Sequence, residues 1–468
     1  MRMKMENQPP LMNMAPHSLW LAMLHGRTGS TLREYEHALE ALPLRDANRS
    51  PSFVVLVGRR TKSEILRHFL RGADADCLPQ NHGQAYLWYD RRSKHGENPT
   101  VYVDCELQTY DRSQCKGSNG RGPDTARTMD WAVSSPRLFT RRKMGNLLCA
   151  RVIAPLSAAV CYFASDLGGM RAVAILLAEQ GVEKPPSDLP ETVLPHVLVV
   201  VETASQDFDA TVTESEFDES VVEIMRSLER YRREGDVRDA LGLHFKQVRV
   251  IGLRRGTDVK SRATALRMRI VTVSKEASVA RAACRLSFRL SHVQGLVGSL
   301  LDQFCRDHAT PFSFVRASRP MGFTTQDFAA HLRELMDRVP LEVSLWHLVA
   351  PLVASSMLLA NYPPGAHLFP PGLVFQQLYR SVCKAAVYGR AVQPLVRKSL
   401  LAVIERDFES LFEELASASG EWAAAALHFR RLRSLHVYLR DLRSHKTCLS
   451  CLLRSPEVRL ITLSEPFR

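Results

Sequence analysis

Short apolar runs alternate with helix-like stretches between residues 51 and 275. Phe53–Val57 and His196–Val201 are continuous apolar runs, which are typical of strands buried on both faces of a sheet. Ala85–Tyr89 and Val101–Val103 predict two more strands, whose spacing suits a hairpin or neighbouring strands. Because helical segments join these strands, the pattern predicts an α/β fold with a mostly parallel sheet covered by helices.

Met268–Val273 predicts one further strand, after which the alternation stops and helical periodicity continues to about Leu442. In Leu400–Ala416 the apolar residues recur every three or four positions, as on one face of a helix. We therefore expect a partly disordered N-terminal extension, an α/β domain, an all-α domain and a short tail. Their expected bounds are 1–50, 51–275, 276–442 and 443–468.

The main candidate site is the turn that follows the first predicted strand. A complete phosphate loop has two glycines separated by four residues, followed by Lys and Ser or Thr. Here the run is Gly58-Arg-Arg-Thr-Lys62-Ser63, which lacks the second glycine and brings the lysine two residues early. One interpretation is a shortened nucleotide loop, in which Arg59, Arg60 and Lys62 place positive charge at a helix N-terminus.

The alternative interpretation of this turn needs no ligand. Thr61 would cap the helix, and Glu64, three residues later, would complete a capping box. Both interpretations predict a strand, a glycine turn and a helix.

Acidic residues follow other predicted strands. Asp104 comes directly after Val101–Val103, at the position where nucleotide hydrolases hold magnesium. Since parallel strands end at one edge of the sheet, Gly58–Ser63, Asp104–Glu106 and Glu202–Thr203 are expected along the same rim. The predicted nucleotide-binding residues are Gly58, Arg59, Lys62, Ser63 and Asp104, with GTP or ATP and magnesium as ligands. Because the loop is incomplete, the pattern favours binding over hydrolysis.

A pair of cysteines near the C-terminus has the spacing of half a zinc site. Cys448 and Cys451 would supply two thiolates, but a tetrahedral zinc needs two more ligands, and no Cys or His follows Cys451. Zinc is therefore expected only if the missing ligands come from elsewhere. The alternative is two free thiols, in keeping with ten scattered cysteines and a reducing compartment.

The run Asp166-Leu-Gly168-Gly169-Met-Arg171 is similar to the oxyanion loop of patatin-type lipases, with Leu167 in place of the first glycine. The sequence holds no Gly-x-Ser-x-Gly motif that would supply a serine nucleophile. This excludes a serine hydrolase of that kind and leaves a glycine turn ahead of a helix as the interpretation.

Charge and hydropathy set limits on partners and compartment. There are 62 Lys and Arg against 49 Asp and Glu, a net charge of +13, but the basic residues are dispersed. This is no strong nucleic-acid signal, although contact with a membrane surface remains open. The sequence has neither a secretory signal nor a run of 18 uncharged apolar residues, so we expect a soluble, cytoplasmic protein with protein partners.

Four stretches resemble one known family: PTVYVDCEL, NLLCARVIAPLSAAVCYFASDLGGMRAVAILLAEQ, LPHVLVVVET and CLSCLLRSPE. They are similar to the region upstream of the lipase domain in large fungal patatin-like phospholipases, also called FabD/lysophospholipase-like proteins. The resemblance implies a P-loop-GTPase-like α/β domain, then a helical region and a zinc element before the lipase domain. It places zinc ligands at Cys448 and Cys451, the phosphate loop at Gly58–Ser63, and the lipase active site beyond Arg468.

The resemblance therefore implies a chain truncated before the lipase domain. The function expected from it is that of a non-lipolytic regulatory or assembly region with a degenerate nucleotide-binding fold. Two alternatives stay open, namely an active GTP or ATP hydrolase and an interaction scaffold with a basic surface.

Overall fold

In the computed structural model the chain forms two compact units, Met1–Phe314 and Val315–Arg468. Apart from a few single residues, the structure describes 18–26, 29–44, 49–70, 83–106, 123–134, 139–203, 208–228, 237–319, 349–362, 366–388 and 394–417.

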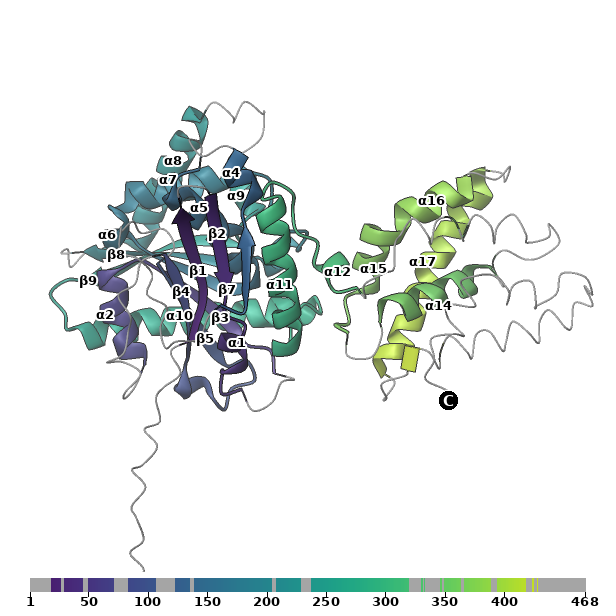
Figure 1. Cartoon of the computed structure of the whole chain (residues 1–468), viewed down its shortest axis with the longest axis horizontal. Coiled ribbons are helices and arrows are strands. Elements are labelled where there is room, and N and C mark those ends of the chain that lie inside the picture. The colour runs from purple at the N-terminus through teal and green to yellow at the C-terminus, as the bar shows by residue number, and fades with distance from the viewer. Residues whose placement is uncertain are drawn as a thin grey trace, which may run out of the picture. The chain divides into compact units, whose positions relative to one another are not determined.

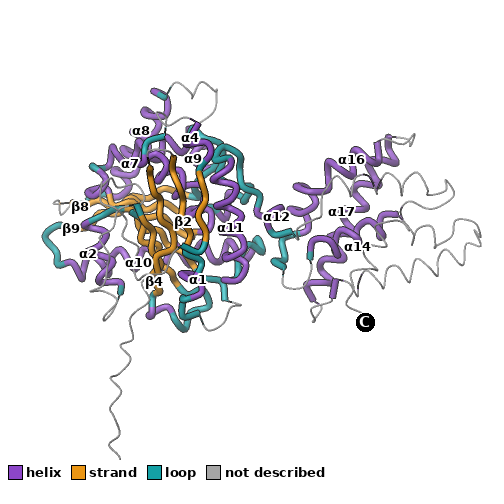
Figure 2. The backbone as a smooth tube through the Cα atoms, in the orientation of Figure 1, coloured by secondary structure: helices purple, strands orange, loops and turns teal. Residues whose placement is uncertain are grey.

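A nine-stranded sheet forms the centre of the first unit (Figures 1 and 2). Five neighbouring strands are parallel, and the other four extend the sheet with antiparallel pairings. Across the sheet the order is β6 (Thr125–Thr128), β2 (Gly29–Glu34), β1 (Ser18–Gly26), β4 (Gln84–Tyr89), β5 (Thr100–Cys105), β3 (Ser52–Val57), β7 (Ser157–Phe163), β8 (His196–Thr203) and β9 (Gln247–Arg254).

The α/β class is confirmed, but the expectation of a mostly parallel sheet is corrected. Four of the eight strand pairings are antiparallel, including that of β4 with β5. Two of the added strands, β1 and β2, lie within residues 1–50, where a partly disordered extension was expected. In β1 the residues from Leu19 to Met23 are all buried, because the strand lies between β2 and β4 inside the sheet.

Helices cover both faces of this sheet, as predicted (Figure 1). The helices are α1 (His37–Glu40), α2 (Arg60–Phe69), α4 (Asp130–Ser134), α5 (Arg141–Leu148), α6 (Ala164–Leu167), α7 (Met170–Gly181), α8 (Ala210–Ser227), α9 (Val237–Gly242), α10 (Val259–Ala283) and α11 (Leu290–Arg306). Shorter turns are η1 (Arg91–Ser93), η4 (Ala154–Leu156) and η5 (Glu191–Val193), and Cys149–Ile153 is a π-helix.

The alternation of side chains along β7 shows which helices cover which face. Phe163 packs in one apolar core with Leu66 of α2 and Ile270 of α10. The neighbouring Tyr162 points the other way, and its hydroxyl lies 3.5 Å from Nε2 of Gln180 on α7. Thus α2 and α10 cover one face, and α7 covers the other.

The strand predicted at Met268–Val273 is wrong, because these residues lie within α10. β-Branched residues around Val271 suggest a strand locally. Over a longer window, Leu266, Ile270, Val273 and Ala277 recur at helical spacing, and all four are buried. The helical period prevails because it lets one face of a 25-residue helix pack on the sheet.

The described part of the second unit is helical, as expected for an all-α region. Its helices are α14 (Ala350–Asn361), α15 (Pro371–Val374), α16 (Arg380–Tyr388) and α17 (Pro394–Ser417), with a π-helix at Phe375–Tyr379; α12 (Phe314–Ala317) begins at the boundary. The predicted stripe is buried on α17, where Phe408 and Phe412 pack against Tyr362 with ring centroids 6.2 and 5.1 Å away. The expected boundary at 276 differs from the structure, since α10 and α11 belong to the unit that contains the sheet.

A buried histidine makes the stability of the first unit depend on pH. His244 is 4% exposed, and its Nε2 lies 3.2 Å from the carbonyl oxygen of Glu183. Burial lowers the pKa of His244 to about 4. In the unfolded chain His244 takes up a proton near pH 6.5, whereas in the folded chain it does so only near pH 4. The free energy of unfolding therefore falls as the pH is lowered from 6.5 to 4.

Between pH 6.5 and 4, we expect the free energy of unfolding to fall by up to about 3 kcal/mol less in His244→Gln than in the wild type. The reason is that glutamine keeps a hydrogen-bond donor for the carbonyl oxygen of Glu183 but does not titrate. Urea unfolding at several pH values measures this. An unchanged pH dependence in the variant would assign the acid sensitivity to other groups.

Candidate functional site

The turn after β3 lies where the strand order of the sheet reverses. From β3 the chain proceeds to β4 and β5 on one side, and later to β7, β8 and β9 on the other. In open α/β sheets, ligands bind at the carboxyl ends of the strands at such a reversal. Gly58, the residue that follows β3, therefore occupies the position where a ligand site is expected.

Lys62 of α2 is completely buried and bonded to two carboxylates. Its ammonium forms an ion pair with Asp104, and its Nζ lies 2.8 Å from Oε1 of Glu106. Both acids are buried at the end of β5. Burial on its own would lower the pKa of Lys62, but Asp104 and Glu106 outweigh it and raise the pKa above its ordinary value.

The backbone amides of the turn bond to a carboxylate from a distant part of the chain. Asp166, on α6, accepts hydrogen bonds from the N–H groups of Arg59 at 2.8 Å, Thr61 at 3.0 Å and Lys62 at 3.0 Å. The Thr61 hydroxyl also lies 3.2 Å from that of Ser165. An anion thus sits on the amides that would otherwise face a phosphate.

The capping box predicted at Thr61 is therefore corrected. Helix α2 begins at Arg60, so Thr61 lies inside the helix, and its N-cap residue Arg59 makes no side-chain capping bond. Glu64 forms an exposed ion pair with Arg60 instead, at 3.5 Å. The amides at the start of the helix are satisfied by Asp166, so no residue of the turn has to cap them.

Glycines shape both sides of this contact. A Cβ on Gly58 would lie 2.7 Å from Oδ2 of Asp166 and 3.0 Å from Cβ of Phe163, so a side chain there would have to displace the carboxylate. After Asp166, Gly168 and Gly169 have φ values of +103° and +95°, which side chains rarely adopt. The two glycines thus form the tight turn between α6 and α7 that follows Asp166, whose carboxylate bonds to the loop after β3.

The structure brings together four of the five residues predicted to bind a nucleotide, namely Gly58, Arg59, Lys62 and Asp104. Ser63 follows in the first turn of α2, where its N–H donates to the carbonyl oxygen of Arg59 at 3.0 Å. Glu202, on the predicted rim, pairs with Arg262 of α10. Cys448 and Cys451 lie outside the described residues, and within those residues no group of three metal ligands occurs.

Sequence reasoning missed the role of Asp166 and of Glu106. The Asp-Leu-Gly-Gly run predicted a glycine turn before a helix, which the structure has, since α7 starts at Met170. The neighbouring sequence gives no sign that Asp166 accepts hydrogen bonds from residues more than one hundred positions earlier. Glu106 was expected on the rim, and the signal available was its spacing of two from Asp104, which puts both carboxylates on one side of the strand.

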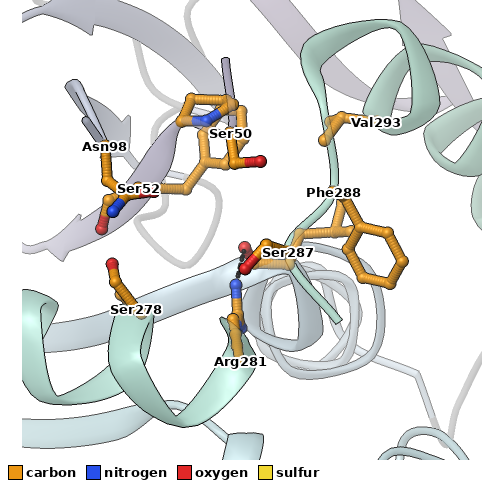
Figure 3. A pocket seen from close by; sticks show the side chains of 12 residues that line it. Ser50, Ser52, Asn98, Ser278, Arg281, Ser287, Phe288 and Val293 are labelled. Carbon is orange, nitrogen blue, oxygen red and sulfur yellow. Dashed lines mark hydrogen bonds between the residues drawn. The ribbon is translucent and has the colours of Figure 1, made fainter. Parts of the chain in front are cut away.

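A second polar feature lies at the opposite, amino-terminal end of β3 (Figure 3). It is a pocket whose walls include Ser52, Ser278 and Arg281. The Arg281 guanidinium donates to the carbonyl oxygens of Leu156 at 3.0 Å and Ser157 at 2.7 Å, and burial lowers its pKa to about 10. Since these bonds tie α10 to the start of β7, Arg281 has a structural role.

Comparisons with known proteins do not identify the chain. No family model matches it, and no curated protein matches it either. Among solved structures, the siderophore hydrolase EstA from Aspergillus nidulans is similar over 58% of this chain and 100% of its own, at 10% identity and a TM-score of 0.26. This likeness is too weak to carry an argument, so the resemblance to patatin-like proteins remains a sequence-based expectation. No helix in the described ranges is long and apolar enough to cross a membrane.

Proposed function

We propose that the first unit is a non-hydrolytic regulatory or assembly domain with a degenerate, P-loop-type nucleotide-binding fold. The observation that supports this best is the state of Lys62. In an active loop the lysine reaches the outer phosphates, and an acid on a neighbouring strand holds magnesium. Here Lys62 and Asp104 are buried against each other, with Glu106 as the second partner of the lysine.

The energetics of this cluster argue against turnover. Drawing Lys62 toward a ligand would leave two buried carboxylates without their cation, at a cost of several kcal/mol. The loop amides are already bonded to Asp166, so a phosphate would also have to displace that carboxylate. At this site the lysine and the loop amides that would bind a nucleotide are therefore already bonded to carboxylates of the protein itself.

The position of the glycine turn in the sheet and the sequence resemblance both support a nucleotide-binding ancestry of the fold. A glycine turn with a lysine sits at the strand-order reversal, next to an acid-ended strand, which is the arrangement expected of a nucleotide-binding sheet. The sequence likeness to the region before the lipase domain of patatin-like proteins supports the same proposal and adds its regulatory setting.

An assembly role is supported by one face of α10. Met268, Val271 and Val279 are 63%, 52% and 62% exposed, and their spacing puts them on a single stripe. The buried stripe of the same helix lies on the opposite side and packs on the sheet. Exposed Lys275 lies between Val271 and Val279 on this stripe, so the face offers a partner both apolar side chains and a positive charge.

We expect the purified chain to release no phosphate from GTP or ATP in the presence of magnesium above the buffer rate, because Lys62 and the loop amides are engaged internally. A phosphate-release assay across the final chromatography peak measures this. Turnover that follows the protein through the peak and is lost in Asp104→Asn would instead support the active-hydrolase alternative; this variant leaves Glu106 to pair with Lys62.

A further inference from the structure

Asp166 differs from the aspartates that cap the helix directly following them. Asp209 accepts from Thr211 and Val212 of the helix it precedes, and Asp258 accepts from Ser261 in the same way. These are ordinary local caps. Asp166 instead comes from α6 and accepts from three N–H groups of a loop 104 to 107 positions away in the sequence. Asp188 and Asp124 also reach helix starts from a distance, where they accept from the N–H groups of Phe314 and His37.

The loop accepts this carboxylate as it would accept a ligand. Three N–H groups converge on the two oxygens of Asp166, with the N–H groups of both Arg59 and Lys62 on Oδ2. Gly58 has no Cβ, and a Cβ there would reach Oδ2 at 2.7 Å. The space beside the glycine is therefore filled by an anion from another element.

The contact lies at the protein surface. Asp166 is half-buried and Ser165 is exposed, so a solute can reach the carboxylate. Arg59 and Arg60 of the same loop are exposed and add positive potential at its mouth. Backbone N–H groups and a helix N-terminus favour tetrahedral oxyanions such as phosphate as well as carboxylates.

We propose that Asp166 is an internal occupant of an oxyanion site, and that the segment Ala164–Gly169 keeps this site closed to phosphate groups. The proposal rests on the proposed function, since it explains how a phosphate-type loop persists without a nucleotide. The ligand class is a tetrahedral phosphate, either free or at the end of a nucleotide. When Asp166 leaves the loop, the amides of Arg59, Thr61 and Lys62 bind the phosphate in its place.

The test compares Asp166→Ala with the wild type by thermal unfolding in potassium phosphate and in potassium chloride of equal ionic strength. We expect phosphate to raise the midpoint of Asp166→Ala by about 2–4 °C and to leave the wild type unchanged. Calorimetric titration with phosphate should likewise show heat of binding only in the variant. GTP and ATP form a second arm, in which tighter binding than phosphate identifies a nucleotide as the source of the group.

Asp209→Ala is the matched control, because it also removes a carboxylate from two helix amides, but from an ordinary local cap. It should show no response to phosphate. If Asp166→Ala does not fold, Asp166→Ser keeps a small acceptor on the loop and should show the same response. A folded Asp166 variant that responds no more than the wild type or Asp209→Ala overturns the proposal, whereas it leaves the absence of hydrolysis in the wild type unaffected.

Discussion

Lys62→Met is expected to lower the free energy of unfolding by about 3–5 kcal/mol at neutral pH. Methionine matches the length of the lysine stem but leaves Asp104 and Glu106 buried side by side without a cation. The loss is a large part of the net stability of a typical domain, so the variant should unfold at a much lower urea concentration.

The pH dependence separates this charge effect from a packing effect. Protonating one of the two carboxylates relieves their repulsion, so the loss in Lys62→Met should shrink as pH is lowered toward 5. Adding Asp104→Asn to Lys62→Met should restore part of the stability in the same way. The control is Arg60→Met, which removes an exposed ion pair with Glu64 and should cost less than about 1 kcal/mol. Equal losses at pH 5 and pH 7 would contradict the ion-pair interpretation.

Gly58→Ala is expected to destabilise the first unit by about 1–3 kcal/mol. The new methyl group would meet Asp166 Oδ2 at 2.7 Å, Phe163 Cβ at 3.0 Å and Lys62 Cβ at 3.1 Å. Each of these atoms belongs to a different element, so no single small shift relieves all three. The most movable of them is the Asp166 carboxylate, and its displacement would break the bonds to the loop amides.

Urea unfolding of Gly58→Ala beside Gly256→Ala gives the comparison. Gly256 is exposed, and a Cβ built there meets no atom within 4 Å, so its substitution should change stability by less than about 0.5 kcal/mol. If the two variants unfold alike, the close approach of Asp166 to Gly58 is not a real constraint.

Much of the sheet could be predicted because burial on both faces leaves a clear mark on the sequence. Phe53–Val57 and His196–Val201 are strands, and both lie among the parallel ones. The antiparallel half was harder to predict. β1 and β2 join the sheet through pairings with β4 and β6, and pairing partners at a distance leave no periodic signal.

The sequence could identify only those residues of the candidate site that lie next to one another in the chain or stand at the end of a predicted strand. Lys62 and Asp104 could be placed near one another because Lys62 follows β3 and Asp104 lies near the end of β5, which pairs with β3. Thr61 and Glu64 matched a capping box by spacing alone, yet the amides bond to Asp166 instead. A long-range carboxylate prevails over a local cap here because it satisfies three N–H groups at once, and local sequence cannot reveal such a partner.

The most direct test of the central claim, that the loop amides are already bonded within the protein, is hydrogen exchange over residues 58–63 of the wild-type chain. With Asp166 on the amides of Arg59, Thr61 and Lys62, this segment should exchange slowly, and GTP with magnesium should not change its rate. A segment that exchanges rapidly in the free protein and becomes protected when GTP is added would contradict the account.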